Sequence, residues 1–467
     1  MSLIHRCARS SRIVDSALPL IVACLGCSGD PGGGATGTSG GEVSGSSGTS
    51  GDASGASTAQ GSTEAETETT STSYPCGDGI KDPEEACDDG NSQNGDGCNV
   101  DCQPSGALRW TYLKDGGKTD IAYGVGASAT GVVAVGTSFV DGQDFNGWVV
   151  ALDEDGALQW ETSVDEGGVE RFLAVSVTGD GRFVAAGARG DADKNIWVRG
   201  FSAGGAIEWS DDVDSGFGHD FARGAAGTAG GEFAVAGVRS LEGGGGELWV
   251  RRYGQGGAIQ STATHPYGYD VVWALGPGVT IDEVTGETVV GFVTQSGARF
   301  PELLVGFPAT GGAAAWTYES LADQAQIHGV ASRSGGLVTT SWDAVVGFVV
   351  ASRSSDGALI WSSASCEGSV GHAIAVDPGD GSVAAIGQGP GATGASIRLC
   401  KFSADGQLLW GHDIDGGVGD DRGWAVTILA DGTIVAAGDQ MAVIGAAGAA
   451  SWGPSCPGAW PCSSSWW

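Results

Sequence analysis

Positive charge is scarce in this chain of 467 residues: 22 Lys and Arg stand against 56 Asp and Glu, and the formal net charge at pH 7 is −34. Nucleic-acid binding requires clustered Lys and Arg against the phosphates, so we expect no nucleic acid among the partners. We interpret the acidity as a property that keeps the protein soluble outside a cell. Binding of a cation or of a basic partner is the alternative.

Helical periodicity is absent after Pro104, which argues against a parallel α/β sheet. Catalytic signatures are missing as well, since the chain contains neither a Gly-x-Ser-x-Gly elbow nor a His-Glu-x-x-His helix. A Gly-Lys-Thr sequence at 117–119 imitates the end of a nucleotide-binding loop, but Tyr112 stands where that loop needs its first glycine. The sequence therefore favours a protein without catalysis.

Long apolar runs are also rare, and the one near the N-terminus is typical of an export signal. Arginines precede an apolar run at 18–23 that is too short to span a bilayer as a helix. Its end resembles a bacterial lipoprotein signal, in which cleavage precedes a lipid-bearing cysteine. Cleavage before Cys27 leaves an even number of cysteines, whereas Cys24 fits the lipoprotein pattern better. We predict that 1–27 is this signal and that Cys27 is lipidated, with Cys24, or an ordinary signal peptide, as the alternatives.

Glycine is abundant: the chain has 85, far above the usual share of ~7%. The stretch 28–74 consists almost wholly of Gly, Ser, Thr, Ala and Glu, and it cannot bury enough apolar surface to offset its ordering entropy. We predict a disordered tether that holds the folded part away from a membrane.

The segment 75–103 is too small to fold by hydrophobic burial alone. Its cysteines, Cys76, Cys87, Cys98 and Cys102, predict disulfides in an exported protein, and the sequence leaves their pairing open. The pattern Cys-Gly-Asp-Gly, then Cys-Asp-Asp-Gly-Asn, then Gly-Asp-Gly-Cys resembles the Myxococcus cysteine-rich repeat of bacterial surface proteins. That resemblance implies a secreted or surface protein and no defined activity.

Oxygen ligands are frequent in this module. Asp78, Asp88, Asp89, Asn91 and Asp96 are of the type that Ca²⁺ prefers. Their spacing differs from that of an EF-hand loop, and Asp-Gly and Asn-Gly pairs also form turns. Calcium is therefore a candidate cofactor, with simple turn formation as the alternative.

A repeat that closes on Gly-x-x-x-Trp organises the remainder of the chain. Its copies lie at 106–110, 156–160, 205–209, 257–261, 312–316, 357–361, 406–410 and 448–452, and only the fourth ends in Ser rather than Trp. Four short strands fit into each interval of roughly 45–50 residues, which is the size of a propeller blade. We predict an all-β fold in which 104–453 forms a β-propeller of seven four-stranded blades. Either 106–110 or 448–452 completes the last blade.

The pattern Asp-x-x-x-Gly-Val, then Trp-Val, then Gly-x-Leu-x-Trp resembles the bacterial seven-bladed β-propeller repeat family over most of the chain. It departs at Ser261, and at Ala325 and Gly371, which replace an acid. These departures leave six or eight blades as alternatives. The repeated Trp and acidic residues are expected to be core and turn residues, because they recur at the same place in most units.

The first strand of each unit carries a Gly or Ala, as blades crowd near a propeller axis. The residue beside it varies and is Tyr123, Leu173, Arg223, Trp273, His328, Ile374 or Trp424. We predict a ligand site formed by Tyr123, Arg223, Trp273, His328 and Trp424, with an empty channel as the alternative.

Two further cysteine pairs are interpreted as structural. Cys366 and Cys400 are expected to join the first and third strands of the sixth unit, and Cys456 and Cys462 to close a loop in the tail 454–467. Together these features predict an exported, monomeric lipoprotein of the outer membrane or cell surface. Its propeller would bind an extracellular protein or glycan and touch the membrane only through the lipid. A secreted hydrolase or oxidoreductase with a site at the propeller axis is the alternative.

Overall fold

A computed structural model describes residues 76–446 except 93, 115–119, 141–143, 192, 267–277, 294–300, 321–324, 392–393, 415–419 and 440–441. The predicted signal 1–27, the tether 28–74 and the tail 454–467 lie outside the described residues. The same holds for Cys24, Cys27, Trp273, Cys456 and Cys462. In the described ranges, no helix is long and apolar enough to cross a membrane.

Short β-branched runs separated by Gly and Asp turns form antiparallel strands, and each group of four makes one twisted sheet. The first sheet contains β2 (Ile121–Ser128), β3 (Gly131–Val140), β4 (Asp144–Leu152) and β5 (Leu158–Val164). The second contains β6 (Glu170–Val177), β7 (Phe183–Arg189), β8 (Asn195–Phe201) and β9 (Ile207–Val213). The third contains β10 (Phe221–Gly227), β11 (Phe233–Ser240), β12 (Gly246–Tyr253) and β13 (Ile259–Pro266).

The same meander recurs in the second half of the chain. The fourth sheet contains β14 (Gly278–Ile281), β15 (Thr288–Val293), β16 (Glu302–Phe307) and β17 (Trp316–Glu319). The fifth contains β18 (Ala325–Arg333), β19 (Gly336–Asp343), β20 (Gly347–Arg353) and β21 (Leu359–Ser363). The sixth contains β22 (Val370–Val376), β23 (Val383–Pro390), β24 (Ala395–Phe402) and β25 (Leu408–Ile414). The last contains β26 (Gly423–Ile428), β27 (Ile434–Gly438), β28 (Ala442–Ala446) and β1 (Leu108–Leu113).

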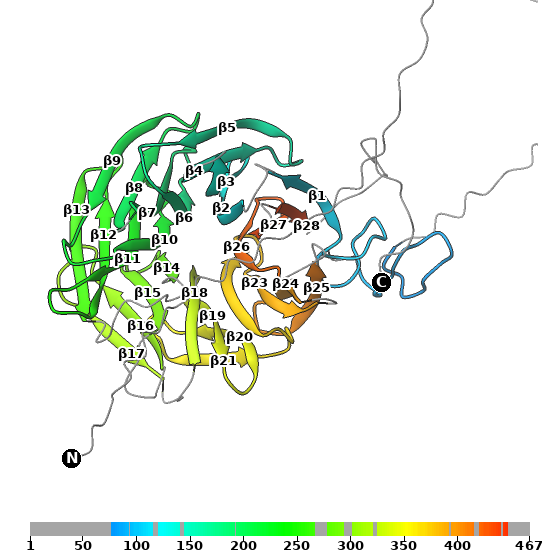
Figure 1. Cartoon of the computed structure of the whole chain (residues 1–467). Coiled ribbons are helices and arrows are strands. Elements are labelled where there is room, and N and C mark those ends of the chain that lie inside the picture. Colours follow the sequence, from blue (N-terminus) through cyan, green and yellow to red (C-terminus); the bar gives the residue numbers. More distant parts are fainter. Residues whose placement is uncertain are drawn as a thin grey trace, which may run out of the picture. The chain divides into compact units, whose positions relative to one another are not determined.

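The described strands thus form seven four-stranded sheets, whose first strands surround a common axis (Figure 1). Each first strand contacts that of the next sheet, and β26 contacts β2, which closes the ring. The predicted all-β propeller of four-stranded blades is confirmed.

The ring is closed by the first strand of the propeller. β1 pairs antiparallel with β28, so that Thr111 lies opposite Ile444 and Leu113 opposite Ala442. The copy of the repeat at 106–110 therefore completes the last sheet, as one of the two alternatives predicted. The last sheet therefore combines one strand from the start of the domain, β1, with three strands from its end.

The repeated residues are structural, as expected. The indoles of Trp148, Trp197 and Trp249 are fully buried between sheets. The glycine of Gly-x-x-x-Trp has a positive φ and lies against the closing indole of the preceding blade: a Cβ added to Gly156 would stand 2.4 Å from Trp110. The motif is therefore a contact between neighbouring blades.

The repeated acids before the first strands cap loops. Asp220 is buried, and its carboxylate accepts hydrogen bonds from the backbone N–H groups of Ser215 and Ser240, at 2.6 and 2.8 Å. Asp120 accepts one from the N–H of Phe139 at 2.8 Å. These contacts hold the entry to the first strand in place, which is why the acid recurs.

The cysteines pair less completely than predicted. Cys87 is bonded to Cys98, whereas Cys76 and Cys102 are free thiols. The Cys76 Sγ lies 3.1 Å from the Asn99 carbonyl oxygen and the Cys102 Sγ lies 3.5 Å from Glu85 Oε1, so each thiol has a polar neighbour instead of a disulfide partner.

The second disulfide joins Cys366 to Cys400, the predicted pair. Cys400 lies in the third strand of its sheet, β24, as expected. Cys366 lies in a turn ahead of β22 and not in the first strand, because β22 begins only at Val370. The bond therefore fastens a loop to the middle of the blade.

Candidate functional site at the propeller axis

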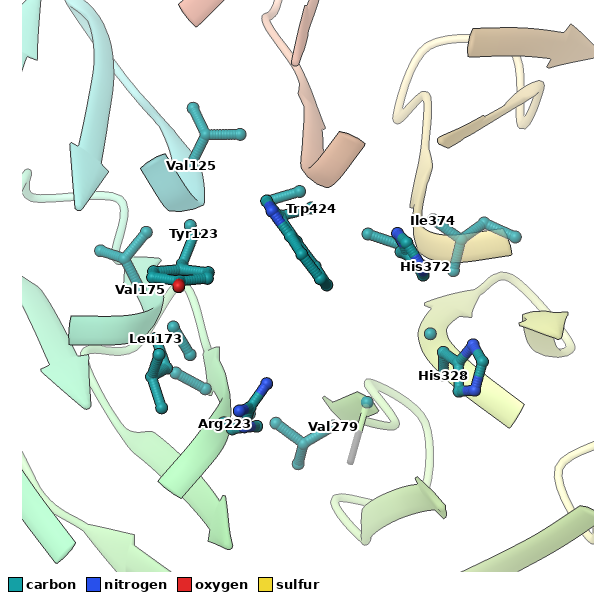
Figure 2. A pocket seen from close by; sticks show the side chains of 18 of the residues that line it. Tyr123, Val125, Leu173, Val175, Arg223, Val279, His328, His372, Ile374 and Trp424 are labelled. Carbon is teal, nitrogen blue, oxygen red and sulfur yellow. The ribbon is translucent and has the colours of Figure 1, made fainter. Parts of the chain in front are cut away.

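A β-bulge interrupts the first strand of six sheets at the same place. The pairing with the second strand skips one residue in each, and the skipped residues are Tyr123, Leu173, Arg223, His328, His372 and Trp424. A bulge turns the side chain of the extra residue away from the regular alternation. All six line one cavity at the axis, and we call them the axial ring (Figure 2).

The bulge explains the glycine that ends the second strand of most units. A Cβ on Gly136 would stand 1.9 Å from the carbonyl oxygen of Ile121, and one on Gly187 would stand 1.8 Å from that of Arg171. A side chain at Gly136 or Gly187 would collide with these carbonyls, whereas the bulge of the fifth sheet has Ser341 at the same position. The glycine of the Val-Ala-x-Gly pattern therefore lies on the second strand opposite the bulge that carries the axial-ring residue.

The structure places most of the predicted ligand residues together. Tyr123, Arg223, His328 and Trp424 line the cavity, and Trp273 lies outside the described residues. The fourth sheet contributes Gly278 and Val279 instead.

One ring residue was missed and another was misplaced. In the sixth unit the prediction aligned Ile374 and Ala375 with the other first strands, but the skipped pairing lies between Gly371 and Ala373. The ring position therefore belongs to His372, and Ile374 lines the cavity one step further along the strand. The pair His372-Ala373 repeats the His328-Gly329 sequence of the preceding unit, which was the available signal.

Aromatic rings follow one another along one arc of the cavity. Trp424 stacks on His372 with ring centroids 4.8 Å apart, and His372 lies 6.0 Å from His328. On its other side Trp424 meets Tyr123 at 5.8 Å in a tilted arrangement. The remaining arc is formed by Leu173, Arg223 and Val279, so the cavity has an aromatic side and a side that carries a cation (Figure 2).

The two histidines of the ring are neutral hydrogen-bonding groups. His328 Nδ1 lies 2.8 Å from the carbonyl oxygen of Gly371, and His372 Nδ1 lies 2.8 Å from that of Gly423. Because a carbonyl oxygen only accepts, both Nδ1 atoms carry the proton and both Nε2 atoms are acceptors. Burial lowers the pKa of His328 to about 3 and that of His372 to about 4.

Charge at the axis is concentrated near the Tyr123 hydroxyl. Burial raises the pKa of Tyr123, and three arginines that favour its ionised form act in the opposite direction. They are Arg171, Arg223 and Arg422. Next to them, Trp424 Nε1 donates a 2.6 Å hydrogen bond to Asp439 Oδ1, and burial raises the pKa of Asp439 to about 6.

Several of the predicted calcium ligands in the cysteine-rich module accept hydrogen bonds from backbone N–H groups. The Asp88 carboxylate accepts hydrogen bonds from the N–H groups of Gly77, Gly79 and Gly90, and Asp89 Oδ2 accepts one from Cys98 at 2.7 Å. The side chain of Asp78 accepts from Ile80, and Asn91 Nδ2 donates to Asp96.

These contacts match turn formation. Among the described residues, the only group of three His, Cys, Asp or Glu side chains close enough to share an ion is Cys76, Glu85 and Cys102. A calcium site at the five predicted residues stays a prediction, and it requires their carboxylates to exchange backbone partners for the ion.

Comparison with known proteins gives remote structural likenesses and no family. No family of proteins and no curated protein matches the chain, so the two repeat resemblances stay predictions. Solved structures that match include the WD40 β-propeller domain of Doa1, at 12% identity and a TM-score of 0.49 over 73% of this chain and 96% of that one. Sqt1 of Chaetomium thermophilum, bound to the N-terminus of ribosomal protein L10, matches at 15% identity and a TM-score of 0.45, over 70% of this chain and 97% of that one. Streptogramin B lyase matches at 14% identity and a TM-score of 0.47, over 72% of this chain and 97% of that one. Likenesses at this level concern the fold alone.

Proposed function

We propose that the protein is an exported lipoprotein of the outer membrane or cell surface whose propeller binds an extracellular ligand at the axial cavity. The observation that supports the binding function is the axial ring itself. Repeated positions of the blades hold Trp, Gly and acids for structural reasons, whereas the bulge positions hold six side chains of five kinds that converge on one cavity. Variation among otherwise equivalent positions favours recognition over packing.

The alternative of catalysis at the axis has less support. A general acid or base needs a pKa near the working pH. Those of His328 and His372 lie well below neutrality, and the residues that line the described cavity include no Asp or Glu. A ligand that is bound and released unchanged is therefore the function that the site supports best.

Binding is tested with the mature chain immobilised and probed with a glycan array and with proteins of the cell envelope, with and without calcium. The proposal expects a ligand that the wild-type chain retains and the Trp424→Ala variant loses. Ile360→Ala, an exposed apolar residue away from the axis, is the matched control and should retain the ligand. Equal capture by all three chains, or no capture at all, would contradict binding at the axis.

Anchoring is tested separately by expression in a bacterial host with labelled palmitate. Cys27→Ala should abolish labelling and release the protein from the membrane fraction, and Cys24→Ala should leave both unchanged. The reverse result would move the lipid to Cys24. If both variants lose the label, the substitutions have damaged the signal itself. If the wild-type protein carries no label, the segment is an ordinary signal peptide.

A further inference from the structure

Among the described residues, none of those that line the axial cavity is an acid, and one of them is Arg223. Arg223 is half-buried, and its Nε atom is shielded from solvent without a hydrogen-bond partner in the described part of the chain. Its guanidinium lies over the Phe221 ring at 5.3 Å, and Arg171 of the preceding sheet lies over the Phe145 ring at 5.0 Å. Within the described ranges, both cations therefore have an aromatic neighbour in place of an acid.

Buried arginines elsewhere in the described chain form ion pairs with acids. Arg199 is almost fully buried, but Glu166 and Asp212 pair with it. Arg353 is paired with Glu302 at 2.8 Å. The sequence has 56 acids, and among the described residues none of them forms an ion pair with Arg223. Shielding part of a cation from solvent without an anion beside it destabilises the folded state, so we expect the ligand to supply the anion for Arg223.

The opposite arc of the cavity offers hydrogen-bond acceptors and apolar faces. The Nδ1 protons of His328 and His372 are donated to backbone carbonyls, so each Nε2 is an acceptor. His328 Nε2 already lies 3.4 Å from the side-chain amide of Gln326, so His372 Nε2 is the acceptor that can receive a hydrogen bond from a ligand hydroxyl group. Trp424 and Tyr123 present aromatic surface beside them. A molecule that fits both arcs carries an anion at one end, a hydroxyl donor at the other and an apolar face between them.

Size restricts the ligand further. The cavity measures about 170 Å³. A cavity of about 150 Å³ accommodates one benzene molecule, so this one takes a single six-membered ring. A monosaccharide with a carboxylate contains one such ring, its substituents extend toward the opening of the cavity, and its C–H groups can pack on aromatic side chains.

We propose that the axial cavity binds one acidic sugar, with its carboxylate on Arg223, a hydroxyl group on Nε2 of His372, and its C–H groups against the edges of the Trp424 and Tyr123 rings. The sugar is either free or the terminal residue of an acidic glycan. This inference rests on the proposed function, because it takes the axial cavity as the ligand site, and it names the class of ligand.

The test uses isothermal titration of the mature chain at pH 7 with methyl glucuronide and methyl glucoside, which differ only at the carboxylate. The glucuronide should bind about tenfold to a hundredfold more tightly, which is the range for a hydrogen bond to a charged group. Equal affinity for the two sugars overturns the acidic class while leaving the axial site in place. Absence of binding by both also overturns it, and the glycan array then decides the proposed function independently.

Two variants localise the effect. Arg223→Gln should reduce the preference for the glucuronide to about threefold or less while its melting temperature stays equal or rises, since a partly shielded cation without an anion beside it is removed. Arg182→Gln, on an exposed turn where it pairs with Asp180 and Glu208, should keep the full preference. A preference that persists in Arg223→Gln contradicts the assignment. Tighter binding of a uronic-acid oligosaccharide than of the single sugar identifies a glycan as the source, and equal binding identifies the free sugar.

Discussion

At the scale of single residues, the two buried imidazoles of the axial ring are neutral groups. His328 and His372 are both less than a tenth exposed, and each donates its Nδ1 proton to the carbonyl of the following blade. A neutral imidazole in the folded state and an ionised one in the unfolded chain make stability depend on pH. Both histidines, of which His372 is the proposed ligand contact, therefore make the stability of the fold depend on pH.

The direction of this dependence follows from the lowered pKa values, about 3 for His328 and about 4 for His372. Between these values and the unfolded pKa of about 6.5, the unfolded chain binds more protons, so stability is full above pH 6.5 and falls as the pH decreases. At pH 5 the loss amounts to about 2 kcal/mol for each histidine. Urea unfolding at pH 7.5 and pH 5 measures it.

His372→Gln should reduce the loss of stability between the two pH values by about half. His219→Gln is the matched control, because His219 is exposed, and it should leave the difference unchanged. An identical pH dependence in wild type and His372→Gln would contradict this assignment. The raised pKa of Asp439, about 6, acts in the opposite direction, because protonation of that carboxyl below pH 6 favours the folded state.

At the scale of the strand, the axial ring depends on a glycine that does not touch the cavity. Gly136→Ala places a methyl group against the carbonyl of Ile121, at the bulge that turns Tyr123 toward the axis. Because the obstacle is backbone, the bulge must shift, and we expect a loss of about 1–3 kcal/mol or more in the free energy of unfolding, together with weaker ligand binding. Chemical denaturation and titration of the ligand measure the two effects.

Gly204→Ala provides the comparison for this substitution. Gly204 lies in a turn with nothing closer to an added Cβ than a Ser202 side-chain oxygen at 4.0 Å, so its free energy of unfolding should change by less than about 1 kcal/mol. Similar losses for both variants would show that glycine flexibility, and not the close approach at the bulge, explains the repeated position.

The bulge also marks how far the sequence alone leads. Gly-x-x-x-Trp recurs because most of its glycines pack on an indole of the preceding blade, so its spacing predicts the blades directly. Gly312, which follows the unit that ends in Ser261, has no such contact. The ring positions need the pairing register in addition. In the sixth unit both Ala373 and Ala375 satisfy the small-residue pattern, and only the pairing of Gly371 and Ala373 with β23 identifies His372. Likewise, which two of four cysteines pair depends on distances that spacing does not determine.

At the scale of the whole molecule, closure of the ring depends on one strand from the start of the domain. β1 covers the open edge of β28, and Trp110 and Tyr112 pack on the core that the last sheet shares with β2 and β4. Without β1 that edge exposes unpaired backbone groups and apolar surface. Closure therefore couples the stability of the first and last sheets, although they are the most distant in sequence.

This coupling predicts different behaviour for two shortened chains. A chain that begins at residue 104 keeps β1 and should melt within a few degrees of the mature protein. One that begins at residue 114 lacks β1 and should melt about 10 °C lower or more, and it should aggregate, because a loss of several kcal/mol shifts a domain of this size by that amount. Calorimetry and light scattering measure both. If the shorter chain melts as the longer one does, β28 is stable as an edge strand, and the blade does not need the first copy of the repeat to close the ring.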